Sequence, residues 1–152
     1  MRFVTPCCPS AKLMLRSTGS PDALPPIFST RFMPDSSPQS APVSPDSLEV
    51  IRKFAETYAK RTDTYFCSDA GVTAVVLEGL ARHKDELGGA LCPCRHYEDK
   101  QAEVSQAFWN CPCVPMRERK ECHCMLFLTE DNPFRGERQT ITTDEIKSYI
   151  ST

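Results

Sequence analysis

The chain has no long apolar run, no excess of basic residues and no internal repeat beyond a set of cysteine pairs. No apolar stretch in its 152 residues approaches the ~20 needed to span a membrane. The net charge of −2 lacks the basic excess that is typical of nucleic-acid-binding proteins. No segment has the apolar core, roughly 7–15 residues long, of a secretory signal peptide. The sequence therefore predicts neither a membrane nor a nucleic-acid partner, and it does not favour a secreted disulfide framework.

Cysteine is the residue that the chain has in abundance. Six of the nine cysteines fall in three Cys-x-Cys pairs within 33 residues: Cys92-Pro93-Cys94, Cys111-Pro112-Cys113 and Cys122-His123-Cys124. A tetrahedral metal or an iron–sulfur cube takes four thiolates, and two would remain for a redox dithiol. The spacing alone does not select which four are ligands.

The local geometry of the pairs places their sulfurs together. A proline that follows Cys92 or Cys111 pushes that cysteine toward an extended conformation and fixes the next φ angle. Residues i and i+2 of an extended segment point to the same face, so both sulfurs of a pair emerge close together. A thiol that is not a ligand would then lie beside the metal site, where it can exchange electrons with it.

The spacing of the three pairs resembles the catalytic subunit of ferredoxin–thioredoxin reductase, over roughly residues 46–150. The resemblance implies that a [4Fe-4S] cluster is held by Cys92, Cys111, Cys113 and Cys122. It also implies that Cys94 and Cys124 form the active disulfide, with Cys94 as the attacking thiol and Cys124 on the cluster side. His123 lies between a ligand and a redox cysteine, where an imidazole can exchange a proton with a leaving thiol or lower its pKa.

The implied function is an enzyme that reduces disulfides. It would pass electrons one at a time from reduced ferredoxin, through the cluster and the active-site disulfide, to thioredoxin. The resemblance further implies a heterodimer with a small variable subunit and a location in the chloroplast, in the plastid stroma. Between the second and third pairs, Arg117, Arg119 and Lys120 form either a solvated loop or a docking surface for an acidic donor.

The alternative is a non-catalytic zinc-binding interaction module, in which all six cysteines and a histidine are structural. Zinc fingers usually space their ligands as C-x₂₋₄-C, so uniform Cys-x-Cys pairs speak against it. Cys67 is interpreted as a small buried hydrophobe, and His83 as packed or half-exposed rather than functional. His96, two residues beyond Cys94, has a weaker claim to function than His123.

Residues 1–45 differ in composition from the rest of the chain. They hold nine of the 13 prolines and eight serines, with four basic against two acidic residues. Such a segment cannot bury enough apolar surface to fold, so we expect disorder. It is similar to an organellar transit peptide, the alternative being a tail without a special purpose. Cys7 and Cys8 would then have no role in the mature protein, and residues 46–152 would form the catalytic iron–sulfur domain.

The remaining pattern predicts a mainly α fold, a small domain of about four helices with cysteine-bearing loops around the cluster. Capping signals, apolar spacing and glycine or proline stops place the helices at 45 to about 60, about 68–88, 98–108 and about 142–150. On the second helix, one apolar side is predicted to contain Val72, Val75, Val76, Leu80 and His83. Pro112 and Pro115 are predicted to end the third helix and to force a loop.

Overall fold

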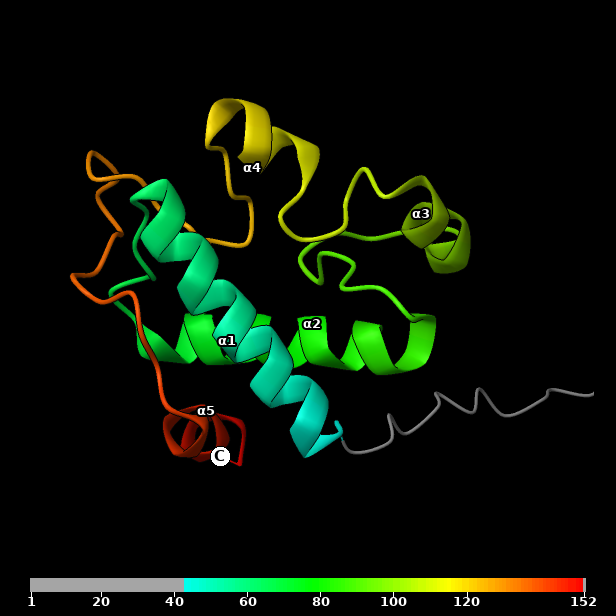
Figure 1. The fold of residues 1–152 in the computed structure, drawn as a ribbon, viewed down its shortest axis with the longest axis horizontal. Coiled ribbons are helices and arrows are strands. Elements are labelled where there is room, and N and C mark those ends of the chain that lie inside the picture. Colours follow the sequence, from blue (N-terminus) through cyan, green and yellow to red (C-terminus); the bar gives the residue numbers. More distant parts are fainter. Residues whose placement is uncertain (1–42, 152) are drawn as a thin grey trace, which may run out of the picture. The chain divides into compact units, whose positions relative to one another are not determined.

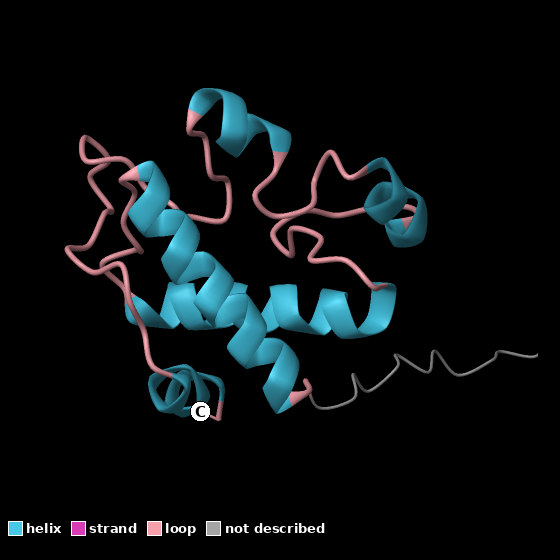
Figure 2. Cartoon of the chain, in the orientation of Figure 1, coloured by secondary structure: helices cyan, strands magenta, loops and turns pink. Residues whose placement is uncertain are grey.

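The computed structural model describes residues 43–151, which lie within one compact unit of the chain. This part contains five helices (Figure 1): α1 (Pro45–Thr62), α2 (Ala70–Leu87), α3 (Lys100–Gln106), α4 (Val114–Arg119) and α5 (Thr143–Ile150). Loops connect them, with isolated β-bridges rather than strands (Figure 2). The predicted mainly α fold is confirmed, with one helix more than expected. The predicted transit peptide, with Cys7 and Cys8, lies outside the described residues except at its last three positions.

α1 begins where Pro45 was expected to open it, but its N-terminus is tied down differently from a usual cap. Ser44 makes no side-chain cap bond. Instead its backbone N–H donates to Asp85 Oδ2 over 2.9 Å, and the Ser47 hydroxyl donates to the other oxygen of that carboxylate. The start of α1 is thereby attached to the last turn of α2. Val43 also packs against the core, so the folded part begins before the predicted boundary at residue 46.

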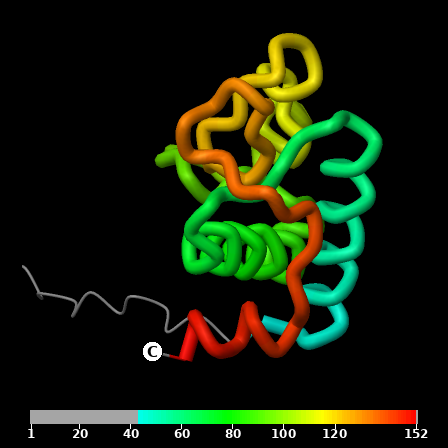
Figure 3. Tube along the Cα trace, turned by 90° about the vertical axis from the view of Figure 1, so that its left-hand side faces the viewer, coloured from blue at the N-terminus to red at the C-terminus, as the bar shows by residue number. Residues whose placement is uncertain are grey.

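α2 packs against α1, α3 and α5 and is the central element of the unit (Figure 3). The Asp69 side chain accepts the Gly71 N–H over 2.8 Å at its start, and Gly88 ends it at a φ of 75°. Leu77 is fully buried, whereas Val75 is 57% exposed. The predicted apolar side was therefore wrong at Val75, because α1 and α5 cover a face that includes the small residues Thr73 and Ala74.

The region between α2 and α5 departs most from the prediction. α3 is shorter than expected, because Asp99 caps its start and Ala107, at a φ of 58°, ends it. α4 was not predicted at all. Pro115 lies in its first turn, where the missing N–H of proline costs no helical hydrogen bond. This short helix buries Met116 in the core.

α5 has the capping box that the sequence predicted. The Glu145 N–H donates to Thr142 Oγ1 over 3.2 Å, and the Thr142 N–H donates to a Glu145 carboxylate oxygen over 3.2 Å. Its Ile146 is fully buried in the core that α1 and α2 share. Within residues 43–151, no helix is both long and apolar enough to cross a membrane.

Candidate metal and dithiol site

Two loops of the chain run side by side and bring the first two cysteine pairs together. The Cys92 N–H donates to the Trp109 carbonyl over 3.0 Å, and the Cys111 N–H donates to the Ala90 carbonyl over 2.8 Å. These bonds surround an antiparallel bridge between Leu91 and Asn110. The third pair follows α4, whose short turn brings the chain back toward the first two (Figure 1).

The backbone that precedes and includes Cys92 is held by two buried side chains of the chain itself. His83, at the buried face of α2, places Nδ1 2.7 Å from the Leu91 carbonyl oxygen. The Tyr97 hydroxyl donates to the Cys92 carbonyl over 3.0 Å. Burial, followed by the nearby Cys92 thiol, raises the pKa of Tyr97, so its phenol keeps the proton that it donates. The position of Cys92 is thus fixed by bonds on both sides of it.

Five cysteines line one pocket, called the cysteine pocket below. They are Cys92, Cys111, Cys113, Cys122 and Cys124. Its other walls are mainly apolar and include Val76, Leu80, Met116, Leu126 and Phe127. All four predicted cluster ligands therefore face a common space, with the predicted redox residue Cys124 beside them.

The donor set of the cysteine pocket fits a thiophilic metal or an iron–sulfur cluster. Its sulfurs are enclosed by apolar side chains, and soft thiolate ligands select such groups over hard cations. Burial raises the pKa of Cys111 and of Cys122, so ionising them inside this pocket is costly unless a cation compensates. A bound metal centre would supply that positive charge.

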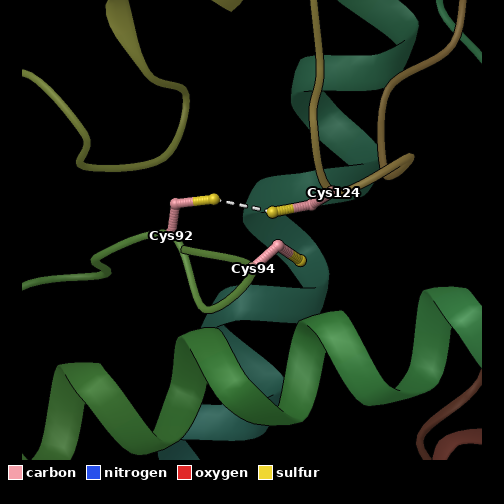
Figure 4. Close-up of side chains that lie close together, drawn as sticks. All are labelled: Cys92, Cys94 and Cys124. Atoms are coloured by element: carbon pink, nitrogen blue, oxygen red, sulfur yellow. Dashed lines mark hydrogen bonds between the residues drawn. The ribbon is translucent and has the colours of Figure 1, made fainter. Parts of the chain in front are cut away.

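Cys94 lies next to this pocket rather than in its lining. Cys92 and Cys94 project from the loop after α2, and Cys124 projects from the loop after α4 (Figure 4). The three Sγ atoms all lie within 4.8 Å of one another, and Cys92 Sγ is 2.6 Å from Cys124 Sγ. Three thiols at these distances could themselves hold a metal ion. This trio combines one predicted ligand with both members of the predicted dithiol.

Exposure and electrostatics distinguish the two members of the predicted dithiol. Cys94 is exposed, whereas Cys124 is buried. Hydrogen bonds from the Cys124 thiol and then the Cys92 thiol lower the pKa of Cys94 from 9.0 to about 4. Its bond with Cys92, and then its bond with Cys94, raise the pKa of Cys124. Of these three thiols, Cys94 is therefore the accessible one that ionises most readily, and Cys124 is a buried one that keeps its proton.

His123 is exposed at the mouth of the cysteine pocket. It also lines an open groove, called the outer groove below, together with Val72, Val75, Cys94, Cys124 and Met125. Its imidazole is thus placed between the sulfur-lined interior and the exposed thiol. Cys67 is buried, as predicted. His83, predicted to be packed or half-exposed, is also buried, and His96 is exposed.

Sequence reasoning missed the residues that support the site from outside the motif. For Tyr97, the only hint in the sequence was that it lies three residues after Cys94. The apolar walls of the cysteine pocket come from α2, α4 and the last cysteine loop. Arg95 stacks over the Trp109 ring, 3.8 Å from its centre, and links the first and second cysteine loops. Arg119 pairs with Glu121 over 2.9 Å, and Lys120 donates to the Thr62 carbonyl. The contacts of Arg95 with Trp109 and of Lys120 with Thr62 join residues far apart in the sequence, which no spacing rule reveals.

Comparison with known proteins agrees with this geometry. Residues 41–149 match the family model described as "Ferredoxin thioredoxin reductase catalytic beta chain". Among curated relatives, "Ferredoxin-thioredoxin reductase catalytic chain, chloroplastic" of Oryza sativa subsp. japonica is 68% identical over 111 residues, which cover 73% of this chain and 76% of the relative. The protein of the same name from Arabidopsis thaliana is 71% identical over 104 residues, which cover 68% of this chain and 71% of the relative.

A cyanobacterial relative extends the comparison beyond plants. "Ferredoxin-thioredoxin reductase, catalytic chain" of Synechocystis sp. is 71% identical over 108 residues, which cover 69% of this chain and 92% of the relative. The plant relatives are named chloroplastic, in agreement with the predicted plastid location. Family and geometry together do not favour the alternative of a zinc-binding module. The chain belongs to the family of ferredoxin–thioredoxin reductase catalytic chains.

Proposed function

We propose that the chain is the catalytic subunit of a reductase that takes electrons one at a time from ferredoxin and delivers them in pairs to the disulfide of thioredoxin. One observation carries this proposal. The exposed Cys94 lies beside the buried Cys124, and Cys124 itself lines the pocket of the other sulfurs. A reactive thiol at the surface is thereby connected to a metal-binding interior through a single residue.

The proposed metal centre is a [4Fe-4S] cluster held by Cys92, Cys111, Cys113 and Cys122. When bound, such a cluster supplies one-electron transfer, which matches a one-electron donor to a two-electron disulfide. The chain's own contribution is a set of four thiolates and an apolar wall. Met116, Leu126 and Phe127 are buried and keep water from the sulfurs.

The proposed exchange begins with the reduced dithiol. The Cys94 thiolate attacks one sulfur of the thioredoxin disulfide, that S–S bond breaks, and the other thioredoxin sulfur leaves as a thiolate. Cys124 then loses its proton and attacks the Cys94 sulfur of the mixed disulfide. The Cys94–Cys124 disulfide forms and the second thioredoxin sulfur leaves. Thioredoxin gains two electrons and two protons in total, one proton from Cys124 and one from solvent, and two electrons from the donor with one proton from solvent restore the Cys94 thiolate and the Cys124 thiol.

His123 is proposed to carry protons in this exchange. It lines both the cysteine pocket and the outer groove, so its ring faces the space next to Cys124 and the space next to Cys94. The imidazole can take the proton that Cys124 must lose before it attacks. It can then return that proton to the thioredoxin sulfur that leaves, so no net proton stays on the ring.

Two surfaces next to the site are proposed for the two protein partners. The outer groove has an apolar lining that includes Val72, the exposed Val75 and Met125, and it borders Cys94. A partner that presents a disulfide from an apolar surface fits there, and we assign this groove to thioredoxin. A second groove contains Arg95, Arg119 and Lys120 beside Cys113 and Cys122, and we assign it to the acidic donor ferredoxin.

The remaining parts of the proposal rest on the family. We propose a heterodimer with a small variable subunit and a location in the stroma of the chloroplast. We also propose that residues 1–45 act as a transit peptide and are absent from the mature enzyme. N-terminal sequencing of the protein isolated from plastids tests the last point, and an intact Met1 there would contradict it.

The decisive experiment traps the mixed disulfide. In a Cys124→Ser variant, Cys94 can attack thioredoxin but nothing resolves the adduct, so a Cys94–thioredoxin disulfide should accumulate on non-reducing gels. A Cys94→Ser variant should form no adduct, and both variants should keep their iron. Cys67→Ala serves as the control, because Cys67 is buried outside the cysteine pocket. Normal thioredoxin reduction by both serine variants would contradict the proposed function.

A further inference from the structure

The loop that carries Cys92 and Cys94 lies against α2 at a residue without a side chain. This loop, residues 92–97, is called the redox loop below. A Cβ atom added to Gly79 would lie 2.7 Å from Pro93 Cβ and 3.0 Å from Pro93 Cγ. Such distances are too short for carbon atoms, since contact between them is favourable only near about 3.5–4.0 Å. The loop reaches its position only because residue 79 is glycine.

Local helix stability gives no reason for a glycine at this position. Gly79 lies in the interior of α2, where glycine is less favourable than alanine because it loses more backbone freedom on folding. The same helix uses alanine at Ala74 and Ala81, both of which are fully buried. The close approach of Pro93 is the feature that sets residue 79 apart from these two.

A displacement of Pro93 would be transmitted toward Cys94 rather than toward Cys92. The Cys92 N–H is bonded to the Trp109 carbonyl and the Cys92 carbonyl to the Tyr97 hydroxyl, so that side is fixed. The proline ring is part of the backbone and cannot rotate away as a flexible side chain can. Cys94 is the next residue, and it is exposed.

We propose that Gly79 is a positioning residue of the redox dithiol: it lets Pro93 lie close enough to α2 for Cys94 to face Cys124. The importance of this dithiol rests on the function proposed above. A side chain at residue 79 pushes Pro93 away from α2 and changes the separation of the two sulfurs. The formation of the Cys94–Cys124 disulfide, which depends on that separation, changes with it.

The test is a cycle of four cluster-containing proteins: wild type, Gly79→Ala, Pro93→Gly and the double variant. Each protein is equilibrated in buffers that contain oxidised and reduced dithiothreitol in graded ratios. Free Cys94 is then labelled with a maleimide, and the label is located by mass spectrometry. Gly79→Ala should keep its iron and its visible spectrum but shift the dithiol–disulfide equilibrium by about tenfold or more, because the stability of a disulfide depends on the separation of its two Cβ atoms. In the Pro93→Gly background both contacting atoms are gone, so the same alanine should have no effect.

The cycle also covers a variant that fails to fold. If Gly79→Ala does not accumulate but the double variant does, the Pro93 contact is the cause and the proposal holds. An equal effect of the alanine in both backgrounds, or wild-type equilibrium in Gly79→Ala, would overturn it. The labelling uses neither ferredoxin nor thioredoxin. A shifted equilibrium in a protein that never reduces thioredoxin would therefore refute the proposed function while leaving the role of Gly79 intact.

Discussion

The helical base, formed by α1, α2 and α5, and the cysteine loops, residues 88–128, are held together by different means. In the base, apolar side chains such as Leu77, Leu80 and Ile146 are almost completely buried, and capping bonds fix the ends of α2 and α5. The cysteine loops contain short helices, an isolated bridge and a pocket lined by sulfurs. The two regions share one core, which contains Cys92 and Cys124 as well as Leu77 and Ile146, so we expect the proposed metal centre to stabilise the loops most and the base less.

The largest expected effect should appear in the cysteine loops and much less in the helical base. Cys111→Ser removes a thiolate from the cysteine pocket, so the protein should lose its iron and the loops their protection from hydrogen exchange. The helices of the base should persist in large part in far-ultraviolet circular dichroism, because their buried side chains pack mainly on one another and meet the cysteine pocket only through residues such as Val76 and Leu80. Cys67→Ala is the matched control and should retain iron. Full iron and sulfide in Cys111→Ser would rule out its assignment as a ligand.

A core substitution in α2 should weaken both regions at once, because the redox loop rests on this helix. Leu77 is fully buried, so Leu77→Ala leaves a cavity where its side chain was and should lower the free energy of unfolding by about 2–5 kcal/mol. Val75→Ala, on the exposed face of the same helix, should change it by less than about 0.5 kcal/mol. Denaturant unfolding of both variants measures the difference. Equal losses would mean that the two faces are not distinct.

Tyr97→Phe should affect the loops and leave the base unchanged. The substitution removes the donor to the Cys92 carbonyl, a loss of about 0.5–1.5 kcal/mol. Iron should therefore pass to a chelator several-fold faster, with no change in the thermal midpoint of the base. Tyr149→Phe, at an exposed tyrosine of α5, is the control. Identical rates of iron release for wild type and Tyr97→Phe would show that this hydrogen bond does not stabilise the metal site.

The smallest expected effect concerns the base and depends on pH. The Ser47 hydroxyl and the Ser44 N–H lower the pKa of Asp85 from its usual 3.8. A carboxyl whose folded pKa is depressed adds stability above its unfolded pKa and loses it as the pH falls through the folded value. The difference in melting temperature between wild type and Asp85→Asn should thus shrink as the pH falls from 5 to 3. A difference that stays constant would show that the carboxylate charge does not hold α1 to α2.

Sequence reasoning succeeded where the signal was local. The capping box at Thr142 and Glu145 and the glycine stop at Gly88 act over a few residues and were predicted correctly. It failed where a signal had two meanings. Pro115 was interpreted as a helix breaker, although proline is also favoured in the first turn of a helix, as in α4.

The parts of the site that could not be predicted depend on contacts between distant residues. The burial of Cys124 and the exposure of Cys94 arise from the way three loops meet, and nothing near either cysteine encodes the difference. The contact of Gly79 with Pro93 joins a helix and a loop that look independent in the sequence. Motif spacing identified the candidate sulfurs, but tertiary packing decided which of them faces solvent.

The cysteine pocket and the outer groove have only three lining residues in common: Val76, His123 and Cys124. If the outer groove receives thioredoxin, as proposed, the choice of partner and the handling of electrons are largely separable properties of this chain. Residues such as Val72 and Val75 belong to the groove alone, so an engineer could reshape them for a different disulfide protein and leave the sulfur-lined interior as it is. The same separation would let the acceptor range diverge between relatives while the electron-transfer core stays constant.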